Sequence, residues 1–234
     1  ADIIHGFRTI FPIPLALGST WDEAAVEKMA EISAKEAAVS GLHVTFSPMV
    51  DLVRDPRWGR VMESTGEDPL LNSRLAAAMV RGYQGENLKE DNWRVAACVK
   101  HFAAYGGALA GRDYNTVDMS ERQLREMYLP GYKAGLDAGA KLVMTSFNTV
   151  DGIPATGNQW LFRDVLRNEF GFEGVVISDW GAIKELIPHG VAKDEKQAAE
   201  LAIKAGVDIE MMTTCYPDYL NEKKQFSIIY SRIL

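Results

Sequence analysis

The stretch FEGVVISDWGAI, residues 172–183, joins a strand-like segment to an ionisable side chain. Its apolar residues, from 174 to 177, have the β-branched composition of a strand that is buried on both faces. Asp179 comes almost directly after them. A carboxylate at the end of a buried strand costs desolvation energy unless it is paired or takes part in chemistry. The stretch therefore predicts a strand of a parallel sheet and a candidate functional group at its end.

Further apolar runs of strand length are spread along the chain, at residues 9–17, 43–50, 94–102, 141–148 and 206–211. Their apolar residues are continuous rather than alternating, as in strands whose two faces are both covered. Segments with helix signals lie between these runs. Strand and helix therefore alternate, which is the pattern of an α/β fold with a parallel sheet.

Capping residues mark where the helices should begin. The capping signals are Thr20 with Glu23, Asp68 before Pro69, Ser120 with Gln123, Asn158, and Asp194 with Gln197. Pro130 lies inside the helix expected after Ser120, and a proline there predicts a kink or a break.

Two architectures fit this alternation, a doubly wound sheet and a (β/α)8 TIM-type barrel. The nucleotide-binding form of the first needs G-x-G-x-x-G, and the nearest stretch, GGALAG at 106–111, has the wrong glycine spacing. Polar residues end several predicted strands, namely Asp51, Lys100, His101, Asn148 and Asp179. Because barrel enzymes build their sites at the carboxyl ends of strands, we predict the barrel. About six strands are visible, so we expect it to be incomplete at one or both ends.

Composition narrows the classes of function. The 234 residues carry a net charge of −7, which disfavours nucleic acid or an anionic membrane as the main partner. The chain is 47% hydrophobic, which is ordinary for a globular protein. No apolar stretch is long enough for a membrane span. Four histidines and two cysteines show no ligand spacing, so we expect no metal and no cofactor.

Asp179 has two interpretations. As a structural residue it would cap a helix beginning near Gly181, because Asp is a common N-cap. As a functional residue it would be a nucleophile or base at the mouth of a barrel. The adjacent Trp180 favours the second interpretation, since an indole can form a wall for a sugar ring, although Trp is also a common core residue.

Lys100 and His101 place two potential cations at the end of a strand. A structural interpretation pairs Lys100 with a carboxylate and lets His101 donate to a backbone carbonyl. A functional interpretation sets them beside a carboxylate, which they would keep ionised at neutral pH. The charged stretch at 54–69 reads as a long loop that ion pairs rigidify.

Several motifs, in the same order as in the family, resemble the N-terminal domain of glycoside hydrolase family 3. The resemblance is strongest to its β-glucosidase-type members. These motifs are DPRWGR at 55–60, VKHFAAYG at 99–106, the stretch at 112–134, VMTSFNTVDGIPATGN at 143–158 and GVVISDWGA at 174–182. The resemblance covers about residues 1–220, and a set of motifs in family order is more specific than any single short pattern.

The resemblance implies a retaining β-glycosidase with Asp179 as the nucleophile. It also implies that the sugar is held by Asp2 of the D-x-x-H-G segment, the last arginine of DPRWGR, which is Arg60, and the pair Lys100 and His101. Trp180 would line the sugar pocket. The substrate implied is a β-glucoside or a β-linked oligosaccharide, cleaved from its non-reducing end.

The resemblance also implies that the acid/base is a Glu on a second, α/β-sandwich domain. We therefore expect residues 1–220 to be a fragment of the family's barrel domain and residues 221–234 to be an atypical tail, from a truncation or a frame change. A periplasmic or secreted location is expected for the full-length parent. The oligomeric state is left open, a homodimer included.

Alternatives remain at this point. The activity could be that of a β-xylosidase, or of the family's β-N-acetylglucosaminidases, although the chain reads KHFAAYGG at 100–107 and lacks the histidine that those enzymes use. A chain without an acid/base could be a non-catalytic sugar-binding remnant. An unrelated barrel chemistry, such as an aldolase with Lys100 as its Schiff base, would leave the Asp179 and Arg60 motifs unexplained.

Overall fold

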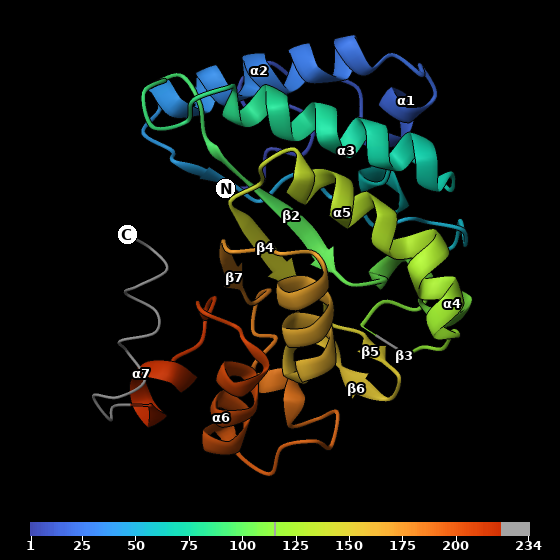
Figure 1. Cartoon of the computed structure of the whole chain (residues 1–234), viewed down its shortest axis with the longest axis vertical. Helices are drawn as coiled ribbons and strands as arrows, with labels where there is room; N and C mark the ends of the chain where they lie inside the picture. The colour runs from blue at the N-terminus through green and yellow to red at the C-terminus, as the bar shows by residue number, and fades with distance from the viewer. Residues whose placement is uncertain (115, 221–234) are drawn as a thin grey trace.

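A four-stranded parallel sheet lies at the centre of the computed structural model, which describes residues 1–114 and 116–220 (Figure 1). Its strands follow the spatial order β1 (Val44–Thr45), β2 (Ala96–Phe102), β4 (Leu142–Thr145) and β7 (Val175–Ile177). Parallel pairing continues past both edges: the Phe46 amide donates to the Ala1 carbonyl at 2.8 Å, and Ile177 bridges to Ile209. The predicted α/β class with a parallel sheet is confirmed.

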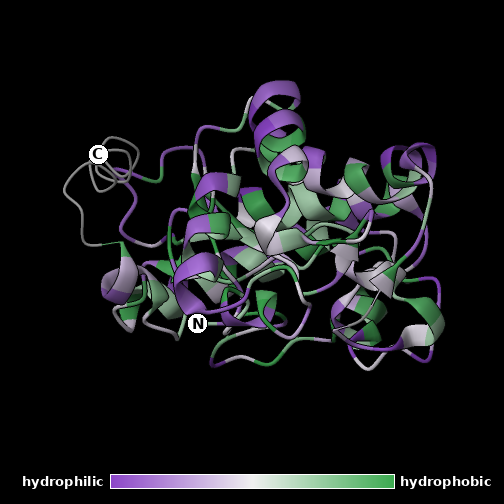
Figure 2. Cartoon of the chain, turned by 90° about the horizontal axis from the view of Figure 1, so that it is seen from below, coloured by the Kyte–Doolittle hydropathy of each residue, from purple (hydrophilic) through white to green (hydrophobic). Residues whose placement is uncertain are grey.

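Helices cover the outside of the sheet. Figure 1 shows α2, α3 and α5 side by side above the strands, and η6 and α6 below. The helical segments are α1 (Pro14–Gly18), α2 (Glu23–Val39), α3 (Pro69–Gln84), α4 (Glu121–Gln123), α5 (Leu129–Asp137), η6 (Trp160–Glu169), α6 (Glu195–Ala205) and α7 (Cys215–Tyr219). In Figure 2 the hydrophobic colour is concentrated toward the interior of the molecule and the hydrophilic colour toward the outer faces of the helices.

A second, three-stranded sheet was not predicted. It consists of β3 (Thr116–Val117), β5 (Thr149–Val150) and β6 (Ile153–Pro154), in the order β3-β5-β6. It lies beyond the carboxyl end of β4, because β5 follows that strand after a short turn.

Most of the predicted capping residues act as expected. Asp68 Oδ1 accepts a hydrogen bond from the Leu71 amide at 2.7 Å, and Asp194 Oδ1 accepts one from Gln197 at 2.9 Å. Thr20 was the wrong choice for α2: the cap is Asp22, which accepts from Ala25 at 2.9 Å. An ionised carboxylate two residues closer to the helix is the better acceptor for its free amides.

Two expectations from the sequence were wrong. The run at 9–17 is not a strand, because Pro12 and Pro14 remove amide donors and Pro14 begins helix α1 instead. Pro130 does not break its helix. A π-helical segment, η4 (Leu124–Tyr128), precedes it and widens the turn whose carbonyl would otherwise clash with the proline ring.

Candidate active site

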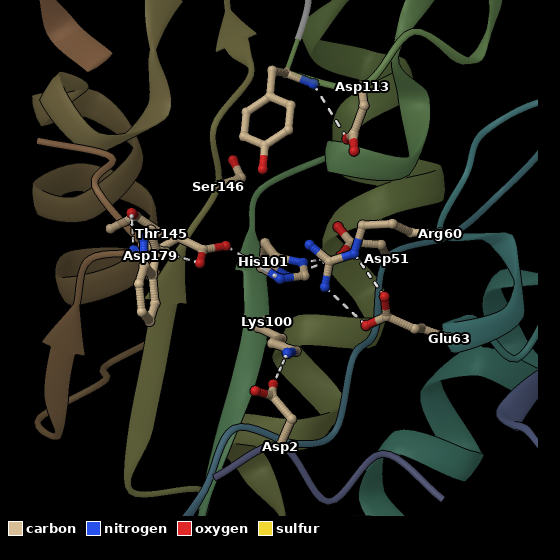
Figure 3. A network of polar contacts seen from close by, with 12 residues as sticks. Asp2, Asp51, Arg60, Glu63, Lys100, His101, Asp113, Thr145, Ser146 and Asp179 are labelled. Atoms are coloured by element: carbon tan, nitrogen blue, oxygen red, sulfur yellow. Dashed lines mark hydrogen bonds and ion pairs between the residues drawn. The ribbon is translucent and has the colours of Figure 1, made fainter. Parts of the chain in front are cut away.

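A hollow of about 380 Å³ opens at the carboxyl ends of the parallel strands. All of the residues predicted for the site line it, namely Asp2, Arg60, Lys100, His101, Asp179 and Trp180. They come from four separate segments of the chain, and Figure 3 shows most of them pointing toward one another. The position agrees with the rule that barrel sites form where strands end.

Asp179 lies at the end of β7 and is only 8% exposed. Its Oδ1 accepts a hydrogen bond from the Trp180 amide at 2.6 Å, and its own amide donates to Thr145 Oγ1 at 3.2 Å. Its Oδ2 lies 3.4 Å from His101 Nε2 and makes no hydrogen bond within the described residues. Asp179 does not cap a helix, since the next helical turn starts only at Lys184.

An irregularity in β2 brings Lys100 and His101 to the same hollow. Neighbouring strand residues normally point to opposite faces. The pairing of β2 with β4 shifts its register between Val99 and Phe102, as at a β-bulge, and such shifts re-aim side chains near functional sites. Lys100 Nζ then pairs with Asp2 Oδ1 at 2.5 Å.

His101 bonds to a carboxylate rather than to the backbone carbonyl that its structural interpretation predicted. Its Nδ1 lies 2.7 Å from Asp51 Oδ2, and its backbone amide donates to the same oxygen at 3.0 Å. The Tyr132 hydroxyl donates to Asp51 Oδ1 at 2.6 Å. Burial alone would raise the pKa of Asp51, but the hydrogen bonds from His101 and Tyr132 outweigh it and hold the pKa below its ordinary value.

Arg60 is held from its own loop. Its Nε and Nη2 donate to the two carboxylate oxygens of Glu63 at 2.7 and 2.8 Å, so the guanidinium presents a fixed edge to the hollow (Figure 3). Burial would lower the pKa of Arg60, but the pairing with Glu63 raises it. The loop is anchored by buried Trp58, whose Nε1 donates to Asp113 at 3.1 Å. The predicted ion-pair reinforcement of this loop is confirmed at Arg60.

Trp180 forms the exposed wall of the hollow, with 63% of its surface accessible. An apolar ring that is exposed beside buried charges suits a ligand that has both an apolar face and hydroxyl groups, as a sugar has. Tyr114 is also half exposed and packs against Phe147, with ring centroids 4.5 Å apart.

The other carboxylates are occupied or lie elsewhere. Glu63 is bound to Arg60, Asp113 accepts from Trp58, and Glu173 is exposed at the opposite end of β7. Sequence reasoning missed Glu185, a half-buried carboxyl in η7 (Lys184–Leu186). Burial, and then the charges of Asp179 and Asp113, raise its pKa to about 7. Its place one turn after the SDW motif was the only available signal.

Sequence reasoning also missed Tyr132 and gave Asp51 no role beyond its place at a strand end.

The described part of the chain contains no group of three His, Cys, Asp or Glu side chains that could hold a metal ion. It also contains no helix long and apolar enough to cross a membrane. Carboxylates, cations and one indole line the hollow together with the apolar side chains of Ile4, Phe46, Met144 and Met211.

Comparison with known proteins gives concordant matches. The family model described as the N-terminal domain of glycosyl hydrolase family 3 matches residues 1–226. A periplasmic β-glucosidase of Salmonella typhimurium is 51% identical over 94% of this chain and 28% of its own length. A β-xylosidase of Formosa agariphila is 40% identical over 89% of this chain and 29% of its own length.

Solved structures agree with these matches. A β-glucosidase from Listeria innocua, crystallised with glucose, superimposes with a TM-score of 0.93 at 62% identity, covering all of this chain and 32% of that one. A β-glucosidase involved in saponin metabolism in intestinal bacteria gives 0.94 at 36% identity over 99% of this chain and 32% of its own. These neighbours confirm the predicted barrel-type α/β fold, of which the described strands supply a part.

The chain spans less than a third of the length of the relatives and structures named above. It covers the portion that the family model describes as N-terminal. The resemblance inferred from the motifs is confirmed, and the chain belongs to glycoside hydrolase family 3.

Proposed function

We propose that this chain is the barrel portion of a retaining β-glycosidase that removes β-linked glucose, or a similar sugar, from the non-reducing end of an oligosaccharide. The observation that carries the proposal is the meeting of Asp179 with Asp2, Arg60, Lys100 and His101 around one hollow. Relatives named β-glucosidase and β-xylosidase support the substrate class, and their names leave glucose and xylose as the two candidate sugars.

Asp179 would act as the nucleophile. Its carboxylate oxygen attacks the anomeric carbon, the bond from that carbon to the leaving oxygen breaks, and a glycosyl ester of Asp179 forms. Water then cleaves the ester and returns the carboxylate. The hydrogen bond from the Trp180 amide holds Asp179 Oδ1 at 2.6 Å, and the other oxygen, Oδ2, lies 3.4 Å from His101 Nε2.

The cations would hold the sugar. Lys100 keeps its carboxylate partner Asp2 within hydrogen-bond distance, and Asp2 remains largely exposed, so the pair can bind neighbouring hydroxyls as donor and acceptor. Arg60 adds a fixed, doubly anchored guanidinium. Charge-assisted bonds of this kind are about twice as strong as neutral ones.

The acid/base would come from outside this chain. Among the described carboxylates that line the hollow with Asp179, Asp2 is paired with Lys100 and Glu63 with Arg60. Relatives about three times as long as this chain support a second domain, and the family resemblance implies that this domain would carry a Glu for the role. The relative named periplasmic supports a periplasmic location.

The test is covalent labelling of the complete gene product. A 2-deoxy-2-fluoro glucoside with an activated leaving group should inactivate the enzyme, and peptide mass spectrometry should find the label on Asp179. Asp179→Asn should take up no label, whereas Glu173→Gln, at the far end of β7, should be labelled normally. Label on any other residue would overturn the assignment of the nucleophile.

A second candidate is that this chain alone binds sugar without turning it over, because no unpaired acid is found among the described residues that line the hollow. An aryl glucoside with a good leaving group needs little acid assistance. If the isolated chain releases a burst of the phenol, then Asp179 reacts without the second domain. Glucose binding by calorimetry without a burst would support the binding role.

A further inference from the structure

Asp51 and Tyr132 form a buried chain of contacts that ends at Asp179. Asp51 is 0% and His101 1% exposed. The Tyr132 hydroxyl donates to Asp51 Oδ1 and also lies 2.6 Å from the His101 carbonyl. Asp51 Oδ2 accepts from both the amide and the ring of His101, whose other ring nitrogen lies 3.4 Å from Asp179.

The donor and acceptor roles along this chain follow from chemistry. An ionised carboxylate only accepts hydrogen bonds, so His101 Nδ1 must carry a proton toward Asp51. The low pKa of Asp51 means that this acceptor stays ionised. The remaining nitrogen, Nε2, is therefore the ring atom that faces Asp179, and it donates to that carboxylate whenever the ring is doubly protonated.

We infer that Asp51 and Tyr132 are positioning residues for the glycosidase reaction: they fix the tautomer and orientation of His101, through which they act on Asp179. This inference rests on the proposed function. A carboxylate that orients a histidine toward a reacting group has a large effect in other enzymes, although it never touches the substrate.

A structural role alone explains the arrangement less well. A buried carboxylate–histidine pair is costly in desolvation and is often no more stable than apolar side chains of equal volume. Here both carboxylate oxygens of Asp51 accept from donors that contact or belong to His101. The other side of the His101 ring lies 3.4 Å from Asp179 Oδ2, a buried oxygen without a hydrogen-bond partner among the described residues. The side-chain contacts of Asp51 thus hold the residue whose ring faces Asp179.

A double-mutant cycle in the complete gene product tests the inference. Asp51→Asn should lower kcat/KM roughly 10²-fold, and His101→Gln should lower it at least as much. If Asp51 acts through His101, then Asp51→Asn should change kcat/KM less than about threefold when His101 is already Gln. Full additivity of the two losses would overturn the inference.

Tyr132→Phe gives a milder variant that keeps the packing. It should lower kcat/KM roughly 5–10-fold, in kcat more than in KM, because it weakens one hydrogen bond to Asp51. Tyr216→Phe is the matched control, since this buried hydroxyl bonds the Val207 carbonyl at 2.8 Å and belongs to no part of the hollow. Equal effects of the two substitutions would count against a positioning role.

Nitrogen-15 NMR of labelled histidine gives a readout that does not depend on activity. The ring of His101 should show a protonated, strongly hydrogen-bonded Nδ1 in the wild type and lose that signal in Asp51→Asn. An unchanged spectrum would contradict the inference even if Asp51→Asn were inactive. If Asp179 is not labelled by the fluoroglucoside, the proposed function fails instead, whatever the histidine spectrum shows.

Discussion

Two hollows on this chain contrast in size and in chemistry. The larger, of about 1020 Å³, lies where α2 and the C-terminal end of α3 meet the loop at 85–94, and its lining includes Glu27, Glu31, Arg81 and Arg94. The smaller, of about 380 Å³, lies at Asp179. In the larger one, paired Arg81 and Glu27 keep 47% and 41% of their side chains exposed. In the smaller one, His101 is withdrawn from solvent almost completely, and so is its partner Asp51, which does not line the hollow.

The proposed site therefore differs from the larger hollow in its buried charge, and it is the smaller of the two in volume. Exposed ion pairs contribute about 0–1 kcal/mol and are common on any surface. Withdrawing an ion from water costs several kcal/mol, so an arrangement of buried ions persists only where geometry or function compensates. The predictions below probe this contrast.

Among variants that compare the two hollows, the largest effect is expected at Arg60. Arg60→Lys keeps the charge but loses the two-pronged contact with Glu63, so kcat/KM should fall roughly 10–10²-fold with little change in stability. Steady-state kinetics on an aryl glucoside measures this. Arg57→Lys is the matched control from the same loop, because its side chain is 69% exposed and pairs with Asp55. Similar losses in both variants would mean that loop rigidity, not Arg60, matters.

A smaller effect is expected at Glu185, on stability. Its folded pKa of about 7 lies above the ordinary value of 4.5, so the folded state binds this proton more tightly than the unfolded chain. The stabilisation is complete below pH 4.5 and is lost as pH rises toward 7 and beyond. Because the group is only half buried, the loss should be about 1–2 kcal/mol.

Glu185→Gln should therefore melt at the same temperature as the wild type near pH 4.5 and at a higher temperature near pH 8. Thermal unfolding across this range, followed by circular dichroism, checks the sign. Glu173→Gln, at an exposed site, should track the wild type at every pH. If the melting temperature of the wild type rises relative to that of Glu185→Gln as the pH rises, the direction of the pKa shift of Glu185 is wrong.

The smallest effect is expected in the larger hollow. Glu27→Gln breaks the exposed pair with Arg81, and the free energy of unfolding should change by less than about 1 kcal/mol. kcat and KM should both stay at their wild-type values. A clear loss of turnover would break the comparison, because it would make the larger hollow part of the active machinery.

The sequence predicted the parallel sheet and the gathering of polar groups, because both follow from local patterns. Strand ends at Lys100, His101 and Asp179 could be read from apolar runs that stop at charges. The strand predicted at 9–17 was wrong, because the prediction gave more weight to the hydrophobicity of the run than to its prolines. Motifs of the family, rather than periodicity, predicted Asp2 and Arg60 as candidate sugar-binding residues.

The partners of these groups could not be predicted, because they are long-range. Asp51 and Tyr132 are 81 residues apart, and Asp51 and His101 are 50 apart. No spacing rule connects such positions. The shift in β2 that turns both Lys100 and His101 inward is likewise a property of the pairing with β4, not of β2 alone.

The π-helical segment at Leu124–Tyr128 has a consequence for engineering this chain. A π turn contains more residues than an α turn, so every side chain after it is rotated about the helix axis relative to a regular helix. Tyr132 follows within one turn and owes its direction to that offset. Trimming one residue to regularise the helix would swing the phenol away from Asp51. A change made for stability would then remove a hydrogen bond from the carboxylate that holds His101.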